Sequence, residues 1–395
     1  MRVLSVFGTR PEAIKMASVV KALEAHPAID AVTCVTGQHR AMLDQVLELF
    51  DIHPAHDLAV MVPNQTLNGL AGRVLGALDP VLDSVKPDIV LVHGDTTTAM
   101  AAGLAAFHRG IKVGHVEAGL RTFDVAHPWP EEMNRRVIDV VSAFLFAPTD
   151  RSRDNLEGER LNGRIFVTGN TVIDTLLQAV ERIETNSAIA AELEQRFSFL
   201  DPRKRVLLVT GHRRESFGEG FENICKALDD LSRRDDLQIV YPVHLNPNVR
   251  EPVNRLLSGG NVHLIDPQEY LPFVWLMRRA DIILTDSGGV QEEAPSLGKP
   301  VLVMRDVTER PEAVAMGTVQ LVGAHRARIV EHVTRLLDDE ALYREHSRRV
   351  NPYGDGKAAE RIVSALLGQD FQPFVPFSSE QAVSAHPTAQ QGVHP

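Results

Sequence analysis

The chain has 395 residues, of which 44% are hydrophobic and 24% charged, so its composition excludes a collagen-like or wholly disordered protein. Its 52 acidic residues outnumber the 41 Lys and Arg, and the net charge of −11 argues against a general nucleic-acid binder, which needs surplus cations. At roughly 150 residues per domain, the length predicts two or three domains.

The sequence predicts a soluble protein of a reducing compartment. The two cysteines, Cys34 and Cys225, lie far apart and form no CxxC pair. The first residues, MRVLSVFGTRPEA, lack the long apolar core and small-residue cleavage site of a secretory signal. No stretch approaches about 18 uninterrupted apolar residues. We therefore expect a cytoplasmic protein with neither a membrane nor a nucleic-acid partner.

Short apolar runs alternate with helical patterns along the first half of the chain. Such alternation predicts βαβ units, and the near-continuous apolar character indicates strands that are buried on both faces of a parallel sheet. The predicted strands are 2–8, 31–37, 88–95, 112–119, 143–149 and 165–169. The predicted helices are 13–25, 42–50, 67–82 and 97–109.

The second half repeats this alternation without detectable sequence repetition. Its predicted strands are 205–212, 238–244, 262–267, 281–289, 300–306 and 319–323, and its clearest helices are 221–231 and 291–297. A polar, helical segment, 171–202, lies between the two arrays. We predict an α/β protein with two doubly wound domains that face a cleft.

The predicted domains are 1–170 and 171–367, and the last helix of the second is able to pack back on the first. The remaining residues, 368–395, form a predicted disordered tail. Residues 372–395 are rich in Pro, Gln, Ser and Ala and contain no Lys or Arg. Such a segment cannot bury enough apolar surface to offset the entropy lost on ordering.

Polar or small residues follow seven of the predicted strands. Any one such cluster is ordinary loop composition, but loop composition explains all seven poorly. Ligands bind outside the carboxyl ends of parallel strands, so these clusters are the candidate site. They occupy positions 8–12, 38–40, 93–95, 117–119, 212–215, 244 and 287–289.

The best single ligand signal is the segment DSGGVQEE at 286–293. Gly288 and Gly289 at a strand-to-helix turn allow an anion to approach backbone N–H groups. Ser287 adds a hydroxyl, and Glu293 can accept hydrogen bonds from sugar hydroxyls. The alternative is a glycine-rich turn with a solvated acidic face, and the residues alone favour neither.

The first strand is followed by FGTRPEAIK rather than GxGxxG, which disfavours a dinucleotide cofactor. Arg10 and Lys15 instead bring two cations to this strand end, where they could hold phosphate. The alternative is a surface pair, which is commoner for Lys15. Because HExxH, a CxxC pair and a metal-spaced carboxylate set are all missing, we predict neither a metal nor a cofactor.

Three carboxylates of the first half, Asp95, Glu117 and Glu131, are candidates for proton transfer. Asp95 and Glu117 each end an apolar strand, and Glu131 precedes Arg135 by one helical turn. Carboxylates beside cations suit acid–base chemistry. The competing interpretations are a cap of the helix at 97–109 for Asp95 and a charge favoured by the helix dipole for Glu131.

His212 follows the first strand of the second half, in the sequence HRRE. Histidine titrates near neutrality, and the neighbouring arginines favour a bound anion. A structural histidine is the default alternative, but the position at a strand end favours a functional role.

The chain carries a series of motifs in order across both halves: FGTRPEAIKMA, VLVHGDTTT, GHVEAGLRT, PWPEE, TGNTVIDTL, TGHRRES, VYPVHLNPNVREPV, TDSGGVQEEAPSLGKPVLV, TERPEA and NPYGDG. From about residue 2 to about residue 367, it resembles the non-hydrolysing UDP-N-acetylglucosamine 2-epimerases. The resemblance implies a GT-B-type fold of two Rossmann-like domains and a homodimer. It also implies reversible conversion of UDP-GlcNAc to UDP-ManNAc without NAD or an obligatory metal, for surface polysaccharide synthesis.

The resemblance also implies site residues. The uridine diphosphate site would use Arg10, Gln268, Phe273, Ser287, Gly288, Gly289, Glu293 and Arg310. The sugar and its β-phosphate would face Lys15, Asp95, Glu117, Glu131 and His212. Gln268, Phe273 and Arg310 rest on the resemblance alone.

The implied reaction eliminates UDP across carbons 1 and 2, giving 2-acetamidoglucal, and then adds UDP back after protonation on the other face. Cationic and N–H groups that hold the departing diphosphate would suit it. The alternatives are a glycosyltransferase of the same architecture, a hydrolysing epimerase and a non-catalytic nucleotide-sugar sensor.

Overall fold

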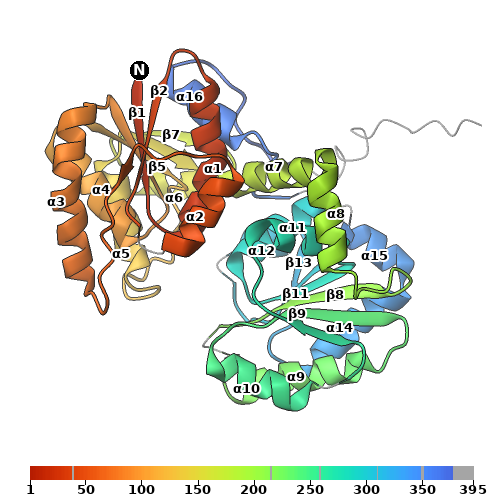
Figure 1. Ribbon diagram of the computed structural model, residues 1–395. Coiled ribbons are helices and arrows are strands. Elements are labelled where there is room, and N and C mark those ends of the chain that lie inside the picture. The colour runs from red at the N-terminus through yellow and green to blue at the C-terminus, as the bar shows by residue number, and fades with distance from the viewer. Residues whose placement is uncertain (38–39, 214–215, 258, 309, 348–350, 377–395) are drawn as a thin grey trace, which may run out of the picture. The chain divides into compact units, whose positions relative to one another are not determined.

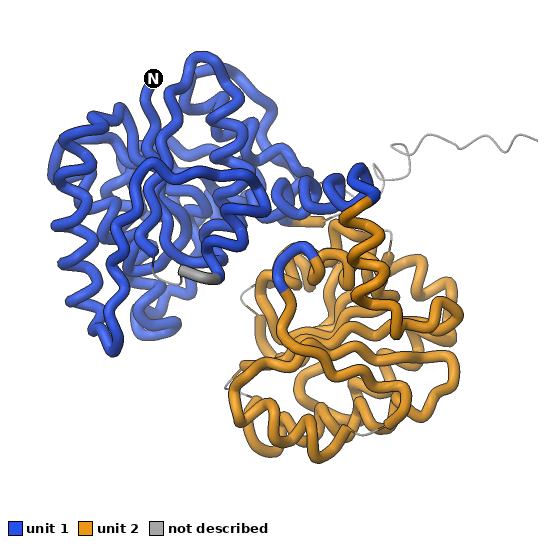
Figure 2. Tube along the Cα trace, in the orientation of Figure 1, with its two compact units in different colours: residues 1–187, 269–271, 353–375 blue, residues 188–268, 272–352, 376–395 orange. Residues whose placement is uncertain are grey.

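The computed structural model describes residues 1–376 except 38–39, 214–215, 258, 309 and 348–350. The chain forms two compact units (Figure 2). Unit 1 consists of residues 1–187, 269–271 and 353–375, and residues 188–268 and 272–352 form unit 2. Each unit is built around a parallel sheet of its own.

Within the described residues, the sheet of unit 1 has seven parallel strands in the order β3-β2-β1-β4-β5-β6-β7. Figure 1 labels β1, β2, β5 and β7 of this sheet. The strands are β1 (Arg2–Phe7), β2 (Asp30–Val35), β3 (His56–Asp57), β4 (Ile89–His93), β5 (Lys112–Val116), β6 (Phe144–Ala147) and β7 (Arg164–Val167). All but β3 lie within the predicted apolar runs or overlap them.

The helices of unit 1 form two groups, as expected when a sheet is wound on both faces. Helix α1 packs against α2, α7 and α16, whereas α4 packs against α3 and α5. The helices are α1 (Arg10–Ala25), α2 (Arg40–Leu49), α3 (Leu67–Val85), α4 (Thr97–His108), α5 (Glu131–Val141), α6 (Asp150–Gly158), α7 (Thr171–Thr185) and α16 (Ala358–Leu366).

In the part of the chain that the structure describes, the sheet of unit 2 has six parallel strands in the order β10-β9-β8-β11-β12-β13. They are β8 (Arg205–Thr210), β9 (Leu237–Pro242), β10 (Val262–Ile265), β11 (Ile282–Thr285), β12 (Val301–Val303) and β13 (Val319–Leu321). The other helices are α8 (Ser187–Arg196), α9 (Glu219–Ser232), α10 (Pro247–Leu256), α11 (Tyr270–Arg279), α12 (Gly288–Glu293), α13 (Pro311–Ala315), α14 (Arg326–Asp338) and α15 (Glu340–Ser347). A short 3₁₀ helix, Ala294–Leu297, continues α12.

Central strands of both sheets are buried on both faces. All residues of β4 and of β11 are buried, which explains why their sequences are continuous apolar runs rather than alternating patterns. The strand order reverses between β1 and β4 in unit 1, and between β8 and β11 in unit 2. The loops after these four strands therefore meet at two switch points, where Rossmann-like sheets bind ligands.

The end of unit 1 differs from the predicted boundaries. Helix α7 belongs to unit 1 rather than to the second domain, and residues 353–375 return to unit 1. There the N–H of Asn170 donates to the Tyr353 carbonyl over 2.6 Å. The buried Phe374 donates its N–H to the Val167 carbonyl over 2.9 Å. The predicted disordered tail is therefore wrong for residues up to 375, and 377–395 lie outside the described residues.

The returning segment also contacts Asp174, a buried residue in the first turn of α7. Its carboxylate accepts the N–H of Ala359, at the start of α16, over 2.8 Å. Burial raises the pKa of Asp174 to about 6, although the bonds from backbone N–H groups partly oppose that shift.

We expect Asp174→Asn to remove part of the pH dependence of stability. Between about pH 4 and about pH 6, the folded protein binds the Asp174 proton more tightly than the unfolded chain does, so the free energy of unfolding falls as pH rises. The fall is on the order of 3 kcal/mol. Asparagine still accepts from Ala359 but cannot ionise. Urea unfolding at several pH values in this window checks the prediction, and equal slopes in both proteins would contradict it.

Candidate active site

At the switch point of unit 1, the Glu12 carboxylate joins the loops after β1 and β4. It accepts the N–H groups of Gly8 (3.0 Å) and Thr9 (2.7 Å) and the hydroxyl of Thr96 (2.6 Å). Thr9 caps α1 in return by accepting the N–H of Glu12, which completes a capping box. No role was predicted for Glu12, although T-x-x-E at 9–12 is the sequence signature of this motif.

Glu117 lies directly after β5 with a left-handed backbone, at a φ of 69°. Its carboxylate forms an ion pair with Lys15 of α1 and lies 3.2 Å from Nε2 of His93. Burial alone would raise the pKa of Glu117, but the charge of Lys15 and the His93 contact hold it well below its usual range. The structure thus brings Lys15 and Glu117 together and keeps Glu117 ionised.

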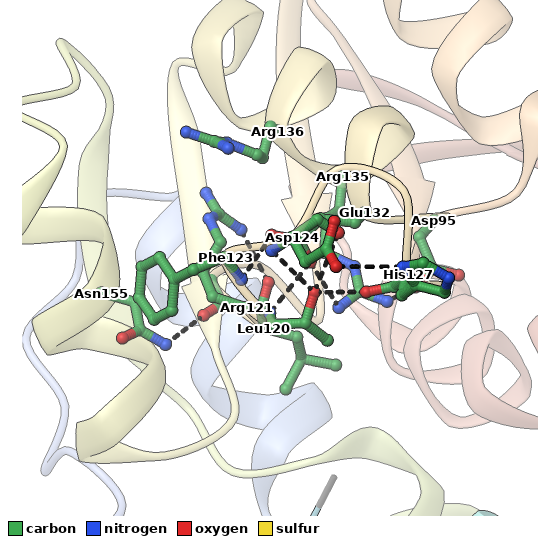
Figure 3. Close-up of polar contacts among 12 residues, drawn as sticks. Asp95, Leu120, Arg121, Phe123, Asp124, His127, Glu132, Arg135, Arg136 and Asn155 are labelled. Carbon is green, nitrogen blue, oxygen red and sulfur yellow. Dashed lines mark hydrogen bonds and ion pairs between the residues drawn. The ribbon is translucent and has the colours of Figure 1, made fainter. Parts of the chain in front are cut away.

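Asp95 follows β4 and faces α5. Nη2 of Arg135 donates to its carboxylate over 2.5 Å (Figure 3). The side-chain amide of Asn134 donates to the Asp95 backbone carbonyl over 2.9 Å. The alternative that Asp95 caps the following helix is wrong. Thr96 is the N-cap of α4, and its hydroxyl accepts the N–H of Ala99 over 3.0 Å.

Glu131 and Glu132 begin α5 but differ in environment. Glu132 is fully buried and accepts the N–H groups of Thr122 (3.0 Å) and Phe123 (3.2 Å) and a guanidinium N–H of Arg135 (3.2 Å) (Figure 3). Glu131 is half-buried, and within the described part of the chain its carboxylate makes no hydrogen bond or ion pair. Glu132 therefore holds the loop before α5, whereas Glu131 is not engaged in any such contact.

At the switch point of unit 2, Asp286 joins the loop after β8 to the end of β11. This buried carboxylate accepts the N–H groups of His212 (2.7 Å) and Arg213 (2.8 Å). The side chain of His212 is 44% exposed, with Nδ1 3.4 Å from Asp286. Its ring stacks on that of His244, with centroids 5.3 Å apart. His212 is thus oriented by its neighbours and open to a ligand, unlike a core histidine.

Helix α12 begins at Gly288, and Ser287 is its N-cap. A Cβ at Gly288 would lie 2.6 Å from the guanidinium carbon of Arg310, so glycine is needed for this close approach. Nε of Arg310 donates to Glu292 over 2.9 Å. Both Glu292 and Glu293 are buried, and the alternative of a solvated acidic face is wrong.

Arg10 opens α1, and Lys15 follows on the same helix, at the edge of unit 1 that carries Glu117. Gln268 precedes α11 and donates to the Asp266 carbonyl over 2.6 Å, and Phe273 is half-buried on α11. Gln38, His39, Arg214 and Glu215, which belong to the polar strand ends of the sequence, lie outside the described residues.

Among the described residues, no group of three or more His, Cys, Asp or Glu side chains has an arrangement that could bind a metal ion. The same residues contain no helix whose length and hydropathy would allow it to span a bilayer.

Each unit therefore gathers charged side chains at the switch point of a Rossmann-like sheet, which defines the class of nucleotide-binding α/β proteins. Comparison with known proteins is more specific. The family described as UDP-N-acetylglucosamine 2-epimerase matches residues 21–367. The UDP-N-acetylglucosamine 2-epimerase of Escherichia coli (strain K12) is 61% identical over 369 residues, which cover 93% of this chain and 98% of that protein.

Solved structures agree with this match. The UDP-GlcNAc 2-epimerase of Neisseria meningitidis, bound to UDP-GlcNAc, is 53% identical, with a TM-score of 0.87 over 93% of this chain and 100% of that one. The enzyme of Methanocaldococcus jannaschii, in complex with UDP-GlcNAc and UDP, is 35% identical, with a TM-score of 0.77 over 93% of this chain and 100% of that one. The chain belongs to the UDP-N-acetylglucosamine 2-epimerase family.

The predicted family and the predicted fold class, an α/β protein of GT-B type with two Rossmann-like units, are confirmed. The predicted enzyme class, an isomerase of the 2-epimerase type, is confirmed as well. The roles of the individual site residues stay predictions.

We expect Lys15→Met to destabilise the protein at pH 7 by about 3 kcal/mol, because it leaves the buried Glu117 charge without its cation. The double variant Lys15→Met/Glu117→Gln should recover much of this loss. A carboxylate whose pKa is lowered in the folded protein stabilises the fold at pH values above the pKa that it has in the unfolded chain. This contribution disappears as the pH falls. The wild-type and single-variant stabilities should therefore converge in acid. Chemical denaturation at pH 7 and in acid checks both statements, and a double variant no more stable than Lys15→Met would contradict the ion-pair argument.

Proposed function

We propose that this protein interconverts UDP-GlcNAc and UDP-ManNAc by eliminating and re-adding UDP. A base removes the proton from carbon 2, the bond between carbon 1 and its oxygen breaks, and the electron pair leaves with the β-phosphate of UDP. The product is 2-acetamidoglucal. Addition of the UDP oxygen to carbon 1, with a proton delivered to the other face of carbon 2, gives the epimer.

The observation that carries this proposal is the set of carboxylates at the switch point of unit 1. Epimerisation through an alkene needs proton transfer on two faces, and so two acid–base groups. Asp95 and Glu131 are the two that we assign to this role. Arg135 orients Asp95, and Glu131 makes no contact within the described residues that would compete with substrate.

We assign a different role to Glu117. A carboxylate whose pKa is held well below its usual range is a weak base, because the efficiency of a base rises as its pKa approaches the working pH. Glu117 instead fixes the ammonium of Lys15, and Lys15 then stabilises the negative charge that develops on the β-phosphate as the bond to carbon 1 breaks.

In unit 2, the residues of the glycine turn are suited to a diphosphate. Ser287, Gly288 and Gly289 present N–H groups at the start of α12, and Arg310 places a cation against the same backbone. Together with Arg10, Gln268, Phe273 and Glu293, these residues are our proposed UDP site. His212, which Asp286 orients, is proposed to face the β-phosphate or the sugar.

The resemblance to the non-hydrolysing enzymes supports the remaining proposals. We propose that the enzyme works as a homodimer in the cytoplasm, without NAD or an obligatory metal. Its product would supply ManNAc-derived sugars for surface polysaccharide synthesis.

Incubation of the purified protein with UDP-GlcNAc alone in deuterium oxide tests the proposed reaction. Elimination and re-addition replace the hydrogen on carbon 2, so product UDP-ManNAc should carry deuterium there. An oxygen-18 label in the bridge between carbon 1 and phosphorus should scramble into the other β-phosphate oxygens, because that bridge opens. UDP-ManNAc that retains protium and an unscrambled bridge would contradict elimination. Release of free ManNAc would indicate hydrolysis instead.

Glu131→Gln and Glu132→Gln form a matched pair that separates chemistry from folding. Glu131→Gln should lower kcat by about 10² or more and leave the melting temperature nearly unchanged, because it removes a proton-transfer group that makes no contact within the described residues. Glu132→Gln should lower the melting temperature, since it weakens the buried bonds to Thr122, Phe123 and Arg135. Steady-state kinetics and thermal melts check both. A fully active Glu131→Gln enzyme would remove Glu131 from the mechanism.

A further inference from the structure

His115 is a fully buried histidine of β5, two residues before Glu117, and both of its ring nitrogens are engaged. Nδ1 lies 2.6 Å from a carboxylate oxygen of Asp139, on α5. Nε2 lies 2.7 Å from the backbone carbonyl oxygen of Gly94, in the turn after β4. No role was predicted for this residue.

These partners decide where the ring protons lie. A carbonyl oxygen can only accept, so Nε2 must carry a proton that it donates to Gly94. An ionised carboxylate also only accepts, so Nδ1 must donate a second proton to Asp139. A ring that donates from both nitrogens is an imidazolium, and His115 is then a buried cation.

This conclusion requires Asp139 to be ionised, and its surroundings support that state. Arg121 is always charged and pairs with Asp139, so it favours the ionised carboxylate independently of His115. Nη2 of the buried Arg121 donates to the second oxygen of Asp139 over 2.7 Å. Both carboxylate oxygens therefore receive a proton donor.

Counting only the cations whose side chains are fully buried, the charges of the cluster balance when His115 is protonated. Arg121 also donates to both oxygens of Glu159, over 2.7 and 2.8 Å. Protonated His115 and Arg121 then face Asp139 and Glu159, two cations against two anions. Neutral His115 would leave a net negative charge among side chains that are almost entirely buried, and such uncompensated charge is costly. Arg136, 3.8 Å from Glu159, contacts the cluster only at its exposed edge.

Gly94 lies between two residues of the candidate site. His93 precedes it and contacts Glu117, and Asp95 follows it and pairs with Arg135. The N–H of Gly94 donates to the Val116 carbonyl over 3.0 Å, so β5 holds this turn through the backbone on one side and through His115 on the other. Gly94 has a φ of 63°, which glycine adopts without strain. Because glycine can also adopt other backbone conformations, contacts with its neighbours are needed to select this one.

We propose that His115 is a positioning residue that stays an imidazolium at physiological pH and fixes the turn 93–95, so that Asp95 is held in place for the reaction. The positioning role rests on the proposed function. The protonation state does not, because it follows from the contacts of His115 with Gly94 and Asp139.

Nuclear magnetic resonance of the wild-type protein with ¹⁵N-labelled histidine tests the protonation state directly. His115, assigned through bonds to its backbone, should show two ring N–H correlations at about pH 7, one for each donating nitrogen. A single ring N–H correlation would overturn the proposal. This result does not depend on whether the protein epimerises UDP-GlcNAc.

Two amide variants test the positioning role. In His115→Gln the amide nitrogen takes the place of Nε2 and can still donate to Gly94, whereas in His115→Asn it takes the place of Nδ1 and can donate only to Asp139. If the bond to Gly94 positions Asp95, His115→Asn should lower kcat about 10-fold further than His115→Gln, with little difference in KM or melting temperature. Equal kcat in both variants, with losses that follow the melting temperature, would reduce His115 to a structural residue. If neither variant folds, the wild-type spectrum still decides the protonation state on which the positioning proposal depends.

Discussion

The carboxylate of Glu12 is the interaction on which the arrangement of unit 1 depends. It satisfies two N–H groups of the turn after β1 and the hydroxyl of Thr96, which in turn caps α4. Two neighbouring strand ends and the helices that follow them are thus joined through a single buried side chain. Strands β1 and β4 lie side by side at the point where the strand order reverses. The contacts of Glu12 therefore also fix the positions of α1, which carries Lys15, and of the turn that carries Asp95.

Buried ions in this protein occur in compensated groups. Lys15 and His93 surround Glu117, Arg135 lies between Asp95 and Glu132, and Asp286 in unit 2 receives backbone N–H groups. Such groups add little net stability, because desolvation offsets most of the attraction. Their value is geometric, since each member has a fixed partner and a defined orientation. The proton transfers proposed for this site would need side chains held in this way.

Local sequence patterns predicted the strands and the glycine turn well, because a buried parallel strand needs a continuous apolar run and a tight turn needs glycine. Features that depend on distant residues could not be read in the same way. Strand β3 has only two residues and forms no pattern. The contacts that surround the buried Glu292 come from Arg310 and Asn351, far along the chain. The return of the last helix to unit 1 was anticipated, but its extension to residue 375 depends on contacts with distant residues such as Val167, which no local pattern in the C-terminal region indicates.

Apart from residues 269–271, which belong to unit 1, that return makes residues 188–352 an insertion within unit 1. During synthesis, the first 187 residues emerge without α16 and without the strand-edge contact of Phe374. The hydrogen bond from the Ala359 N–H to Asp174 cannot form until Ala359, 185 residues later, has been synthesised. Unit 2 is complete before that partner leaves the ribosome, so it can fold while unit 1 is still unfinished. Unit 1 therefore cannot acquire its last helix until residues 188–352 have been synthesised.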